Sequence, residues 1–500
     1  MNALRKVAVW LDDRLHLTAL YASTAGHHVP ASAGSWFYVF GSATLLCFLI
    51  QIISGTCLAF VYVPSTNEAY TSLEYLNHAQ FWGWYLRAVH YWGSNFMVFI
   101  MTLHMIQVFL FGAYKYPREL TWVTGVFLLL CTLAMSFTGQ VLRFDQDAYW
   151  GLTIGASITG RVPLIGAQLV HLLLAGPIIA GETLSRFFTL HVFIIPALII
   201  AIVSTHLRLV LVKGINEYPR PGHPVHKSTY DAEYAEILHR EGVPFVPHAI
   251  GKDLIFSGLV IVGILGCAFF LGPKGPLGEP NPTIVDTNPR PDFYFLSIFA
   301  ALALLPDWME VLVLFVAPTI AILFLLCLPF ISGKGEKSFR RRPVAVLSVL
   351  FIMLVIGILA YMGETSPWSP YMSAWSGDPV PVAYLRGRTP LEMHGALVFQ
   401  HKQCRNCHAL GGSGGERGPT LDAVATRLTK DQLVRQVIQG GGNMPAYGQK
   451  LTPAEVEALV AFLRTLNPKT KPPVQDAAPP LNKLPRDVAE APQSHSLLKT

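Results

Sequence analysis

Two apolar stretches determine the architecture of this chain: residues 80–112, QFWGWYLRAVHYWGSNFMVFIMTLHMIQVFLFG, and residues 183–214, TLSRFFTLHVFIIPALIIAIVSTHLRLVLVKG. The first carries His90 and His104, and the second carries His191 and His206. On an α-helix, a separation of 14 or 15 residues turns the second side chain by only about −40° or +60°, so each pair shares one face. The rise between its members is about 21 to 22 Å, which is well over half of a bilayer core.

A single histidine in an apolar helix is usually a packed, hydrogen-bonded core residue. Four histidines at matched depths indicate that they ligate a metal or cofactor instead, because it costs free energy to place polar side chains in the hydrocarbon region. Neutral imidazole is a good axial ligand for haem iron. Two such helices facing each other are therefore expected to hold two flat cofactors stacked across the membrane.

The composition indicates a polytopic membrane protein. Of 500 residues, 52% are hydrophobic and 14% are charged, and the mean hydropathy is +0.42. The net charge of +6 is small for this length and gives no reason to expect a nucleic-acid partner. We therefore predict an all-α fold in the membrane. Apolar runs long enough to cross a bilayer lie near residues 36–62, 85–112, 122–142, 186–212, 252–272, 308–331 and 343–362.

The distribution of basic residues predicts the orientation of these seven spans. Most Lys and Arg outside the spans fall on one side of the membrane, including Lys115, Lys213 and Lys334. The positive-inside rule then places the N-terminus in the cytoplasm of a bacterial cell. An odd number of spans delivers everything after residue 362 to the periplasmic side of the cytoplasmic membrane.

The chain divides into six segments. Residues 1–35 contain no cleavable signal pattern and are expected to begin with an amphipathic surface helix. We expect a four-helix domain, a three-helix domain, a Pro/Ser/Gly-rich linker, a small soluble α-helical domain and a proline-rich flexible tail after it. Their expected boundaries are 36–215, 216–365, 366–387, 388–468 and 469–500.

The soluble domain carries a haem-attachment motif. Residues 404–408, CRNCH, form a CxxCH pattern, in which Cys404 and Cys407 would bind haem covalently and His408 would be an axial ligand. Met444, in a Gly-rich loop, is suited to be the second axial ligand. A redox dithiol or half of a zinc site is the alternative interpretation. Together with a capped closing helix, LTPAEVEALVAFLRTL, these features resemble a Class I monohaem cytochrome c.

Two glycine pairs repeat the histidine period in other spans. Gly41 and Gly55 are 14 residues apart, as are Gly125 and Gly139. Glycine lets a backbone approach a ligand closely, so these pairs are expected to flank cofactors at the two depths that the histidines define.

The first 365 residues resemble cytochrome b of the Rieske/cytochrome b complexes. The histidine spacing and residues 117–125, PRELTWVTG, are most similar to the chloroplast-type branch, here with its two halves fused. The resemblance implies two non-covalent b haems, with Arg87 and Arg118 near the haem propionates, and a homodimer. It assigns His90 and His191 to the outer haem, and His104 and His206 to the inner haem.

The family's quinol-oxidation motif, Pro-Glu-Trp-Tyr, matches residues 291–294, Pro-Asp-Phe-Tyr. The resemblance makes Asp292 and Tyr294 the catalytic candidates, with Asp292 accepting a proton as quinol is oxidised. Residues 306–309, Pro-Asp-Trp-Met, are a second match, and a helix-capping Asp292 is the plain structural alternative.

Two positions depart from the chloroplast-type pattern. Val39 stands where that branch has a cysteine that binds an extra haem, so no covalently attached third membrane haem is expected. Leu211 stands where family members place Arg or His at the inner quinone site, so the inner site stays unassigned.

The resemblance implies an electron-transfer subunit of a quinol:cytochrome c oxidoreductase. Quinol oxidised at the outer face would pass one electron to a Rieske iron–sulfur protein and one across the membrane through the b haems. The Rieske protein and other subunits would be separate chains, and the tethered cytochrome c would reduce a soluble or membrane acceptor. The alternatives are a haem-bearing membrane anchor for a dehydrogenase and a transporter with a haem sensor domain.

Overall fold

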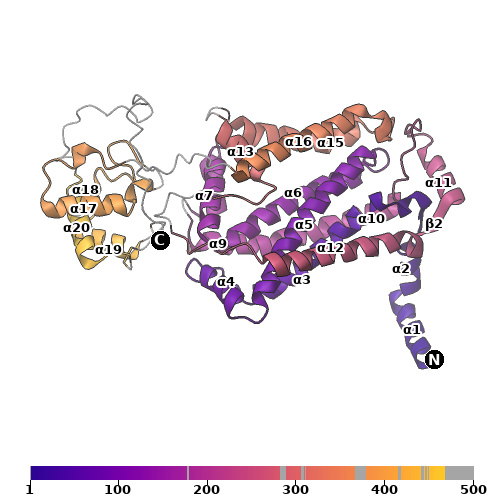
Figure 1. The fold of residues 1–500 in the computed structure, drawn as a ribbon, viewed down its shortest axis with the longest axis horizontal. Helices are drawn as coiled ribbons and strands as arrows, with labels where there is room; N and C mark the ends of the chain where they lie inside the picture. Colours follow the sequence, from indigo (N-terminus) through magenta and orange to yellow (C-terminus); the bar gives the residue numbers. More distant parts are fainter. Residues whose placement is uncertain are drawn as a thin grey trace, which may run out of the picture. The chain divides into compact units, whose positions relative to one another are not determined.

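The computed structural model describes residues 2–176, 179–281, 289–305, 309, 311–365, 379–414, 418–440, 444, 447–448 and 450–467. The chain forms two compact units, a membrane unit that ends near residue 372 and a C-terminal unit that comes after it (Figure 1). Each unit has its own core, as expected for domains that are joined by a linker.

Across the described residues, seven helices are long and apolar enough to cross a membrane, which confirms the predicted spans. Three of them contain a short π-helical segment, which joins α9 to α10 in one span and precedes α12 and α15 in the other two. The spanning helices are α3 (Phe40–Ala59), α5 (Gly83–Leu110), α6 (Glu119–Leu142), α9 with α10 (Gly181–Thr189 and Ile195–Lys213), α12 (Ile250–Leu271), α15 (Ala317–Ile331) and α16 (Pro343–Thr365).

Four of these helices form the bundle that carries the histidines. α3 packs mainly against α5, and α6 packs mainly against α10. Ala43 and Cys47 of α3 are fully buried in its core, beside Ile199 of α10 and Ile264 of α12. Small side chains let membrane helices approach closely, which is how the bundle closes without large apolar residues at every contact.

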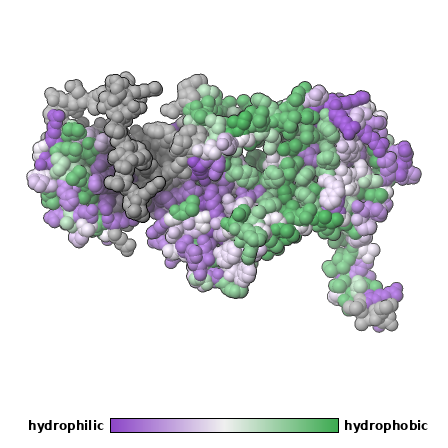
Figure 2. Space-filling model, viewed as in Figure 1, coloured by the Kyte–Doolittle hydropathy of each residue, from purple (hydrophilic) through white to green (hydrophobic). Residues whose placement is uncertain are grey.

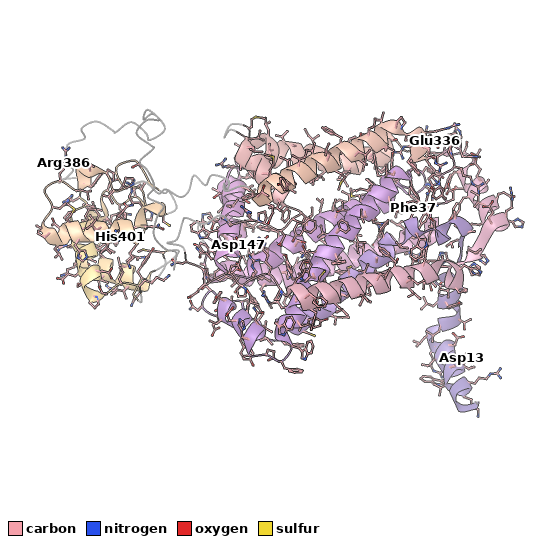
Figure 3. All side chains as sticks on the ribbon, viewed as in Figure 1. Asp13, Phe37, Asp147, Glu336, Arg386 and His401 are labelled. Atoms are coloured by element: carbon pink, nitrogen blue, oxygen red, sulfur yellow. The ribbon has the colours of Figure 1, made fainter. Side chains whose placement is uncertain are left out.

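Shorter elements lie at the two ends of the bundle (Figure 1). One end holds the helices α4 (Ala69–His78), α7 (Gln146–Gly160), α8 (Gly166–Leu174) and α13 (Leu296–Leu304). The other end holds α11 (Tyr230–Glu241). Figure 3 labels Asp147 at the first end, and Phe37 and Glu336 at the second. We call these the outer and inner ends, in line with the predicted orientation.

The N-terminal segment is helical only in part. α1 (Asn2–Leu15) and α2 (Leu17–Ser23) are separated at His16, which has a left-handed φ of 50°. The chain then forms the strand β1 (His28–Pro30), which pairs antiparallel with β2 (Gly242–Pro244). Three-residue strands are too short to show an alternating pattern, so the sequence did not predict this ribbon.

The exposed surface of the membrane unit matches a lipid environment. On the face shown in Figure 2, hydrophobic residues cover the middle of the bundle and hydrophilic residues gather at both ends. Phe270 and Phe351 are 82% and 66% exposed, and both lie within long apolar runs of the sequence. Large apolar side chains exposed at this density are typical of contact with lipid.

The C-terminal unit is a small helical domain. α17 (Pro390–His401) packs against α20 (Pro453–Arg464), with α18 (Val424–Arg427) and α19 (Lys430–Gln439) around them. A capping box starts α20, where Thr452 and Glu455 satisfy each other's backbone N–H groups, as predicted. Val380 and Tyr384, which we expected in the linker, belong to the core of this unit.

Candidate haem sites and quinol site

The outer histidines face each other across the bundle. His90 lies on α5, and His191 lies on the π-helical segment Leu190–Ile194 that precedes α10. Their ring centroids are 6.3 Å apart at an interplanar angle of 75°. Both rings line one cavity, together with Gly55 and Gly139. The structure therefore brings the two outer histidines together with one glycine of each repeating pair.

The inner histidines lie on the same two helices as the repeating pattern predicts. His104 lies on α5 and His206 on α10. A Cβ atom on Gly41 would lie 3.2 Å from Cε1 of His104, and one on Gly125 would lie 3.6 Å from Cε1 of His206. Each glycine thus lies against a different histidine.

The glycines make room for the imidazole rings. A Cβ atom on Gly139 would lie 2.7 Å from Cε1 of His191, and one on Gly55 would lie 2.9 Å from Cε1 of His90. Any side chain at these positions would displace the ring. The sequence predicted close approach of a ligand, and the structure locates that approach at the histidines.

Hydroxyl side chains hold three of the four imidazoles. The Nδ1 atoms of His90, His191 and His206 each lie within hydrogen-bond distance of a hydroxyl oxygen. The oxygens are those of Ser54 at 2.9 Å, Thr138 at 3.0 Å and Thr124 at 2.9 Å, respectively. The sequence analysis missed these residues, although each directly precedes one of the repeating glycines.

The described side chains fit two b haems. Two histidine pairs face each other at two depths, glycines leave space beside every ring, and the hydroxyl contacts occupy Nδ1 and leave Nε2 available to a metal. The outer pair opens into a cavity that is large and mostly apolar, as a porphyrin requires.

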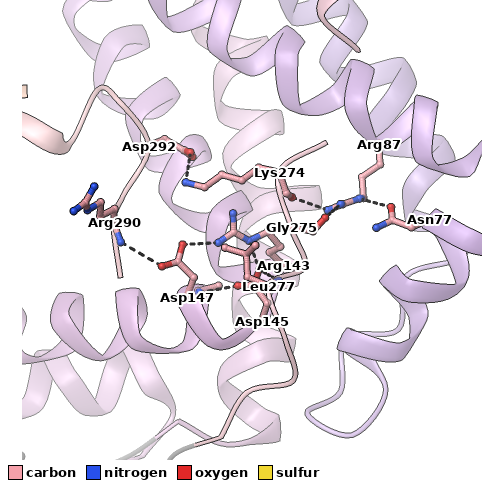
Figure 4. A network of polar contacts seen from close by, with 11 residues as sticks. Asn77, Arg87, Arg143, Asp145, Asp147, Lys274, Gly275, Leu277, Arg290 and Asp292 are labelled. Atoms are coloured by element: carbon pink, nitrogen blue, oxygen red, sulfur yellow. Dashed lines mark hydrogen bonds and ion pairs between the residues drawn. The ribbon is translucent and has the colours of Figure 1, made fainter. Parts of the chain in front are cut away.

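Arg87 lies at the outer end of the same cavity. Its guanidinium donates hydrogen bonds to Asn77 Oδ1 at 2.8 Å and to the backbone oxygens of Lys274, at 3.1 Å, and Gly275 (Figure 4). These contacts fix the loop after α12 against α5. They also hold a positive charge at the cavity rim, which is consistent with the predicted contact to a propionate.

A second buried arginine fixes the same loop. Arg143 forms ion pairs with Asp145 at 2.8 Å and with Asp147 at 2.9 Å. The two carboxylates accept hydrogen bonds from the backbone N–H groups of Leu277 and Arg290, respectively (Figure 4). The segment that leads to residues 291–294 is therefore anchored to α6 and α7.

The predicted quinol motif lies between two cavities. Asp292 and Tyr294 line the histidine cavity, whereas Pro291 and Phe295 line a neighbouring apolar cavity. The second cavity is also lined by Gln140 of α6, next to Gly139. The competing motif at 306–309 lies outside the described residues except for its last position.

Asp292 has two polar partners. The Tyr294 hydroxyl donates a hydrogen bond to Asp292 Oδ2 at 3.0 Å, and the Lys274 ammonium lies 3.2 Å from Asp292 Oδ1. Burial and the adjacent carboxylate raise the pKa of Tyr294, so its hydroxyl stays protonated. The side chain of Asp292 is 10% exposed, and it faces the cavity that holds the outer histidines.

Arg118 lies at the inner end but is engaged by protein groups. It donates hydrogen bonds to the Gly214 oxygen at 3.0 Å and to the Tyr230 hydroxyl at 2.6 Å, and it also reaches the carbonyl of Lys213. These bonds satisfy carbonyls at the C-terminal end of α10. Contact between Arg118 and a propionate therefore stays a prediction.

Two buried ion pairs at the inner end were not predicted. Lys252 and Asp253, at the start of α12, are 9% and 7% exposed and lie 2.9 Å apart. Lys337 and Glu217 lie 2.5 Å apart, and the Lys337 side chain is 4% exposed. Charged residues at the edge of a span are usually exposed to solvent, so the burial of these four side chains could not be predicted from the sequence.

The C-terminal unit places the haem-attachment residues around one site. Burial and the neighbouring Cys407 raise the pKa of Cys404 to about 12. His408 Nδ1 lies 2.8 Å from the Pro419 oxygen, which leaves Nε2 for a metal. A Cβ atom on Gly418 would collide with the His408 ring. These side chains fit a covalently attached haem.

The second predicted ligand of this unit also lies in its core. Met444 packs against the buried apolar residues, and its sulfur lies 3.7 Å from Gln436 Nε2.

Burial lowers the pKa of His408, so the imidazole is in the neutral form that binds metal ions.

Comparisons with known proteins agree with this division of the chain. Residues 26–214 match the family model "Cytochrome b/b6/petB", residues 280–382 match "Cytochrome b(C-terminal)/b6/petD", and residues 391–463 match "Cytochrome C oxidase, cbb3-type, subunit III".

Individual relatives and a solved structure are similar to the membrane unit. Cytochrome b6 of Crocosphaera subtropica is 37% identical over 211 residues, which cover 42% of this chain and 95% of that protein. Cytochrome b6 of Synechococcus sp. (strain JA-3-3Ab) is 38% identical over 213 residues, 43% of this chain and 99% of that protein. A chain of the structure titled "Hyperthermophilic respiratory Complex III" aligns with a TM-score of 0.58 and 27% identity, covering 72% of this chain and 91% of that chain.

Proposed function

The chain belongs to the cytochrome b family and carries a cytochrome c domain at its C-terminus, and from this premise we propose a specific function. It is the cytochrome b/c fusion subunit of a proton-motive quinol:cytochrome c oxidoreductase. It oxidises quinol at the outer face of a bacterial cytoplasmic membrane, with its N-terminus in the cytoplasm and its cytochrome c domain in the periplasm.

Ten residues would hold the cofactors. When bound, two b haems supply one-electron carriers between the membrane faces, and one c haem supplies a carrier on the outer side. His90 and His191 would hold the outer b haem, His104 and His206 the inner one, and Arg87 would neutralise a propionate. Cys404, Cys407, His408 and Met444 would hold the c haem, and Arg118 is the tenth residue, proposed for the inner propionates.

The placement of residues 291–295 between two cavities is the observation that supports quinol oxidation. The quinol ring would bind in the apolar cavity that Pro291 and Phe295 line. Asp292, which lines the histidine cavity on the other side of the same segment, would accept a proton as the quinol is oxidised. Tyr294 and Lys274 hold its carboxylate in place through their contacts with it.

Quinone reduction at the inner end would use the buried pair Lys252 and Asp253. A charged pair inside a span is expensive and is by default a functional candidate. Phe256, one turn further along α12, contacts Phe40, which is next to Gly41 at the depth of the inner histidines. The pair could therefore bind a quinone oxygen and supply protons from the cytoplasmic side.

The same proposal defines the partners. A separate Rieske protein would take the first electron of quinol, and the tethered cytochrome c would pass it to a soluble or membrane acceptor. A similar solved chain belongs to a respiratory Complex III, which supports assembly with other subunits of such a complex, and a homodimer is proposed on family grounds.

Purification of the tagged full chain from its native membrane tests the proposal. The expected result is co-purification of a Rieske protein, together with quinol-driven electron transfer that is sensitive to stigmatellin- or antimycin-type inhibitors. Quinol-independent reduction by a co-purified dehydrogenase, with no Rieske protein present, would instead establish a membrane anchor and overturn the proposal.

A further inference from the structure

A hydroxyl residue directly precedes three of the four glycines that face the histidines. The dipeptides are Ser54-Gly55 on α3, and Thr124-Gly125 and Thr138-Gly139 on α6. In each, the glycine lies against one imidazole ring, and the hydroxyl contacts Nδ1 of the same ring. The fourth dipeptide is Phe40-Gly41, which has no hydroxyl.

Each hydroxyl group already donates its proton within its own helix, and this determines which ring nitrogen of the histidine is protonated. Each hydroxyl donates to a carbonyl oxygen of the preceding turn of its own helix, so it can only accept from the imidazole. Nδ1 must then carry the proton, and Nε2 keeps its lone pair for iron. The donor bonds run from Ser54 to Ile50 at 2.6 Å, from Thr124 to Thr121 at 2.9 Å, and from Thr138 to Ala134 at 2.9 Å.

The inner pair is asymmetric. His206 is held by Thr124, whereas no residue in the described ranges hydrogen bonds to His104. Both outer histidines, His90 and His191, have a hydroxyl partner. A Cβ atom on Gly41 would lie 3.2 Å from the His104 ring, so the ring is packed, but the described part of the chain offers no acceptor for an Nδ1 proton.

We propose that Ser54, Thr124 and Thr138 are positioning residues for the haem-ligating imidazoles, and that Phe40 withholds this contact from the inner site. An acceptor at Nδ1 raises the basicity of the ligating imidazole and so favours the oxidised metal. The outer site has two such ligands and the inner site has one, which makes the inner site the easier to reduce. The difference favours inward electron transfer, so this inference rests on the proposed function.

Redox titration of the purified full chain, monitored by optical and EPR spectra, tests the threonines. In Thr138→Val, which has the same shape without a hydroxyl, the potential of one b haem should rise and its low-spin EPR signal should shift. Thr138→Ser should restore both. Thr124→Val should act on the other b haem. Unchanged potentials and EPR signals in both valine variants would overturn the inference.

A substitution at Phe40 tests the inference in the opposite direction, because it adds a hydroxyl next to Gly41. Phe40→Ser supplies the fourth dipeptide with a hydroxyl, and Phe40→Ala is the matched control that loses the same contact with Phe256. The serine variant should lower the potential of the b haem that Thr124→Val raises, relative to the alanine variant. Equal potentials would contradict the inference. Absence of two b haems from the unaltered chain would instead overturn the proposed function.

Discussion

The Asp292 carboxylate is held between a proton donor and a cation, because Tyr294 donates to one oxygen at 3.0 Å and Lys274 lies 3.2 Å from the other. The three side chains line the cavity of the outer histidines, while the adjacent residues of the chain line the apolar cavity beside it. A short segment thus connects the proposed quinol cavity to the redox centre.

Removal of this carboxylate is expected to slow quinol oxidation. Asp292→Ala should reduce the rate of quinol-driven b haem reduction by roughly 10²- to 10⁴-fold, since that is the usual contribution of a positioned general base. The b haem spectra should stay intact, because Asp292 is not a ligand. Asp292→Glu, which keeps the carboxylate, is the control and should retain most of the rate. Unchanged turnover in the alanine variant would exclude this role.

Alanine substitutions at two glycines should differ in effect. At Gly139 a Cβ atom would lie 2.7 Å from His191 Cε1, so Gly139→Ala must displace the ring and should lower the b haem content of the purified chain. At Gly125 the corresponding distance to His206 is 3.6 Å, an ordinary contact, so Gly125→Ala should keep both b haems. The haem content is measured from pyridine haemochrome spectra, and equal occupancy in the two variants would contradict this ranking.

Features that depend on helical period and span length could be predicted from the sequence. Apolar runs located all seven spans, and the largest difference is at the start of the fifth, which was expected at 252 and lies at Phe245. The matched separations predicted that the glycine pairs lie at the two depths of the histidines, because helical rise and rotation are regular, and the structure pairs Gly139 with His191.

Other features of the site could not be predicted, for specific reasons. Ser and Thr are common in membrane helices, so nothing in the sequence distinguishes Thr138 from other threonines. Its contact with His191 is visible only in the structure. The burial of Lys252 with Asp253 depends on how the inner end of α12 packs. The partners of Arg118 come from α10 and α11, which are distant in sequence.

The buried Lys337 is expected to make stability depend on pH. Burial lowers the pKa of Lys337 to about 8 from its ordinary 10.5, against the pull of Glu217. Between these values the unfolded chain binds more protons, so stability should rise with pH, by at most about 3 kcal/mol. Burial opposes ionisation of Glu217, yet Lys337 and Arg118 together lower its pKa. The contribution of the Glu217 carboxylate to stability is therefore lost only as the pH falls into the acid range.

Thermal unfolding in detergent between pH 8 and 10.5 measures this effect. The midpoint temperature of the unaltered chain should rise with pH relative to that of Lys337→Met, which has no titrating group at this position. Arg340→Met, at a more exposed neighbouring position, is the control and should behave like the unaltered chain. Parallel curves for the unaltered chain and Lys337→Met would contradict the assignment.

Substitutions of Met444 and Cys404 in the C-terminal unit should have different effects on the covalent attachment of the c haem and on its redox potential. Met444→Ala should keep the haem covalently attached, as seen by haem staining of a denaturing gel, but should lower the potential of the c haem. Cys404→Ala should weaken or abolish the stain while the b haem spectrum is unchanged. A normal c haem potential in Met444→Ala would show that another residue is the second ligand.

Quantitative haem analysis of the purified full chain tests the central claim most directly. Four histidines paired at two depths and one CRNCH motif predict two non-covalent b haems and one covalent c haem per chain. A chain with fewer than two b haems, with a third haem in its membrane unit, or without a covalent haem would contradict this account.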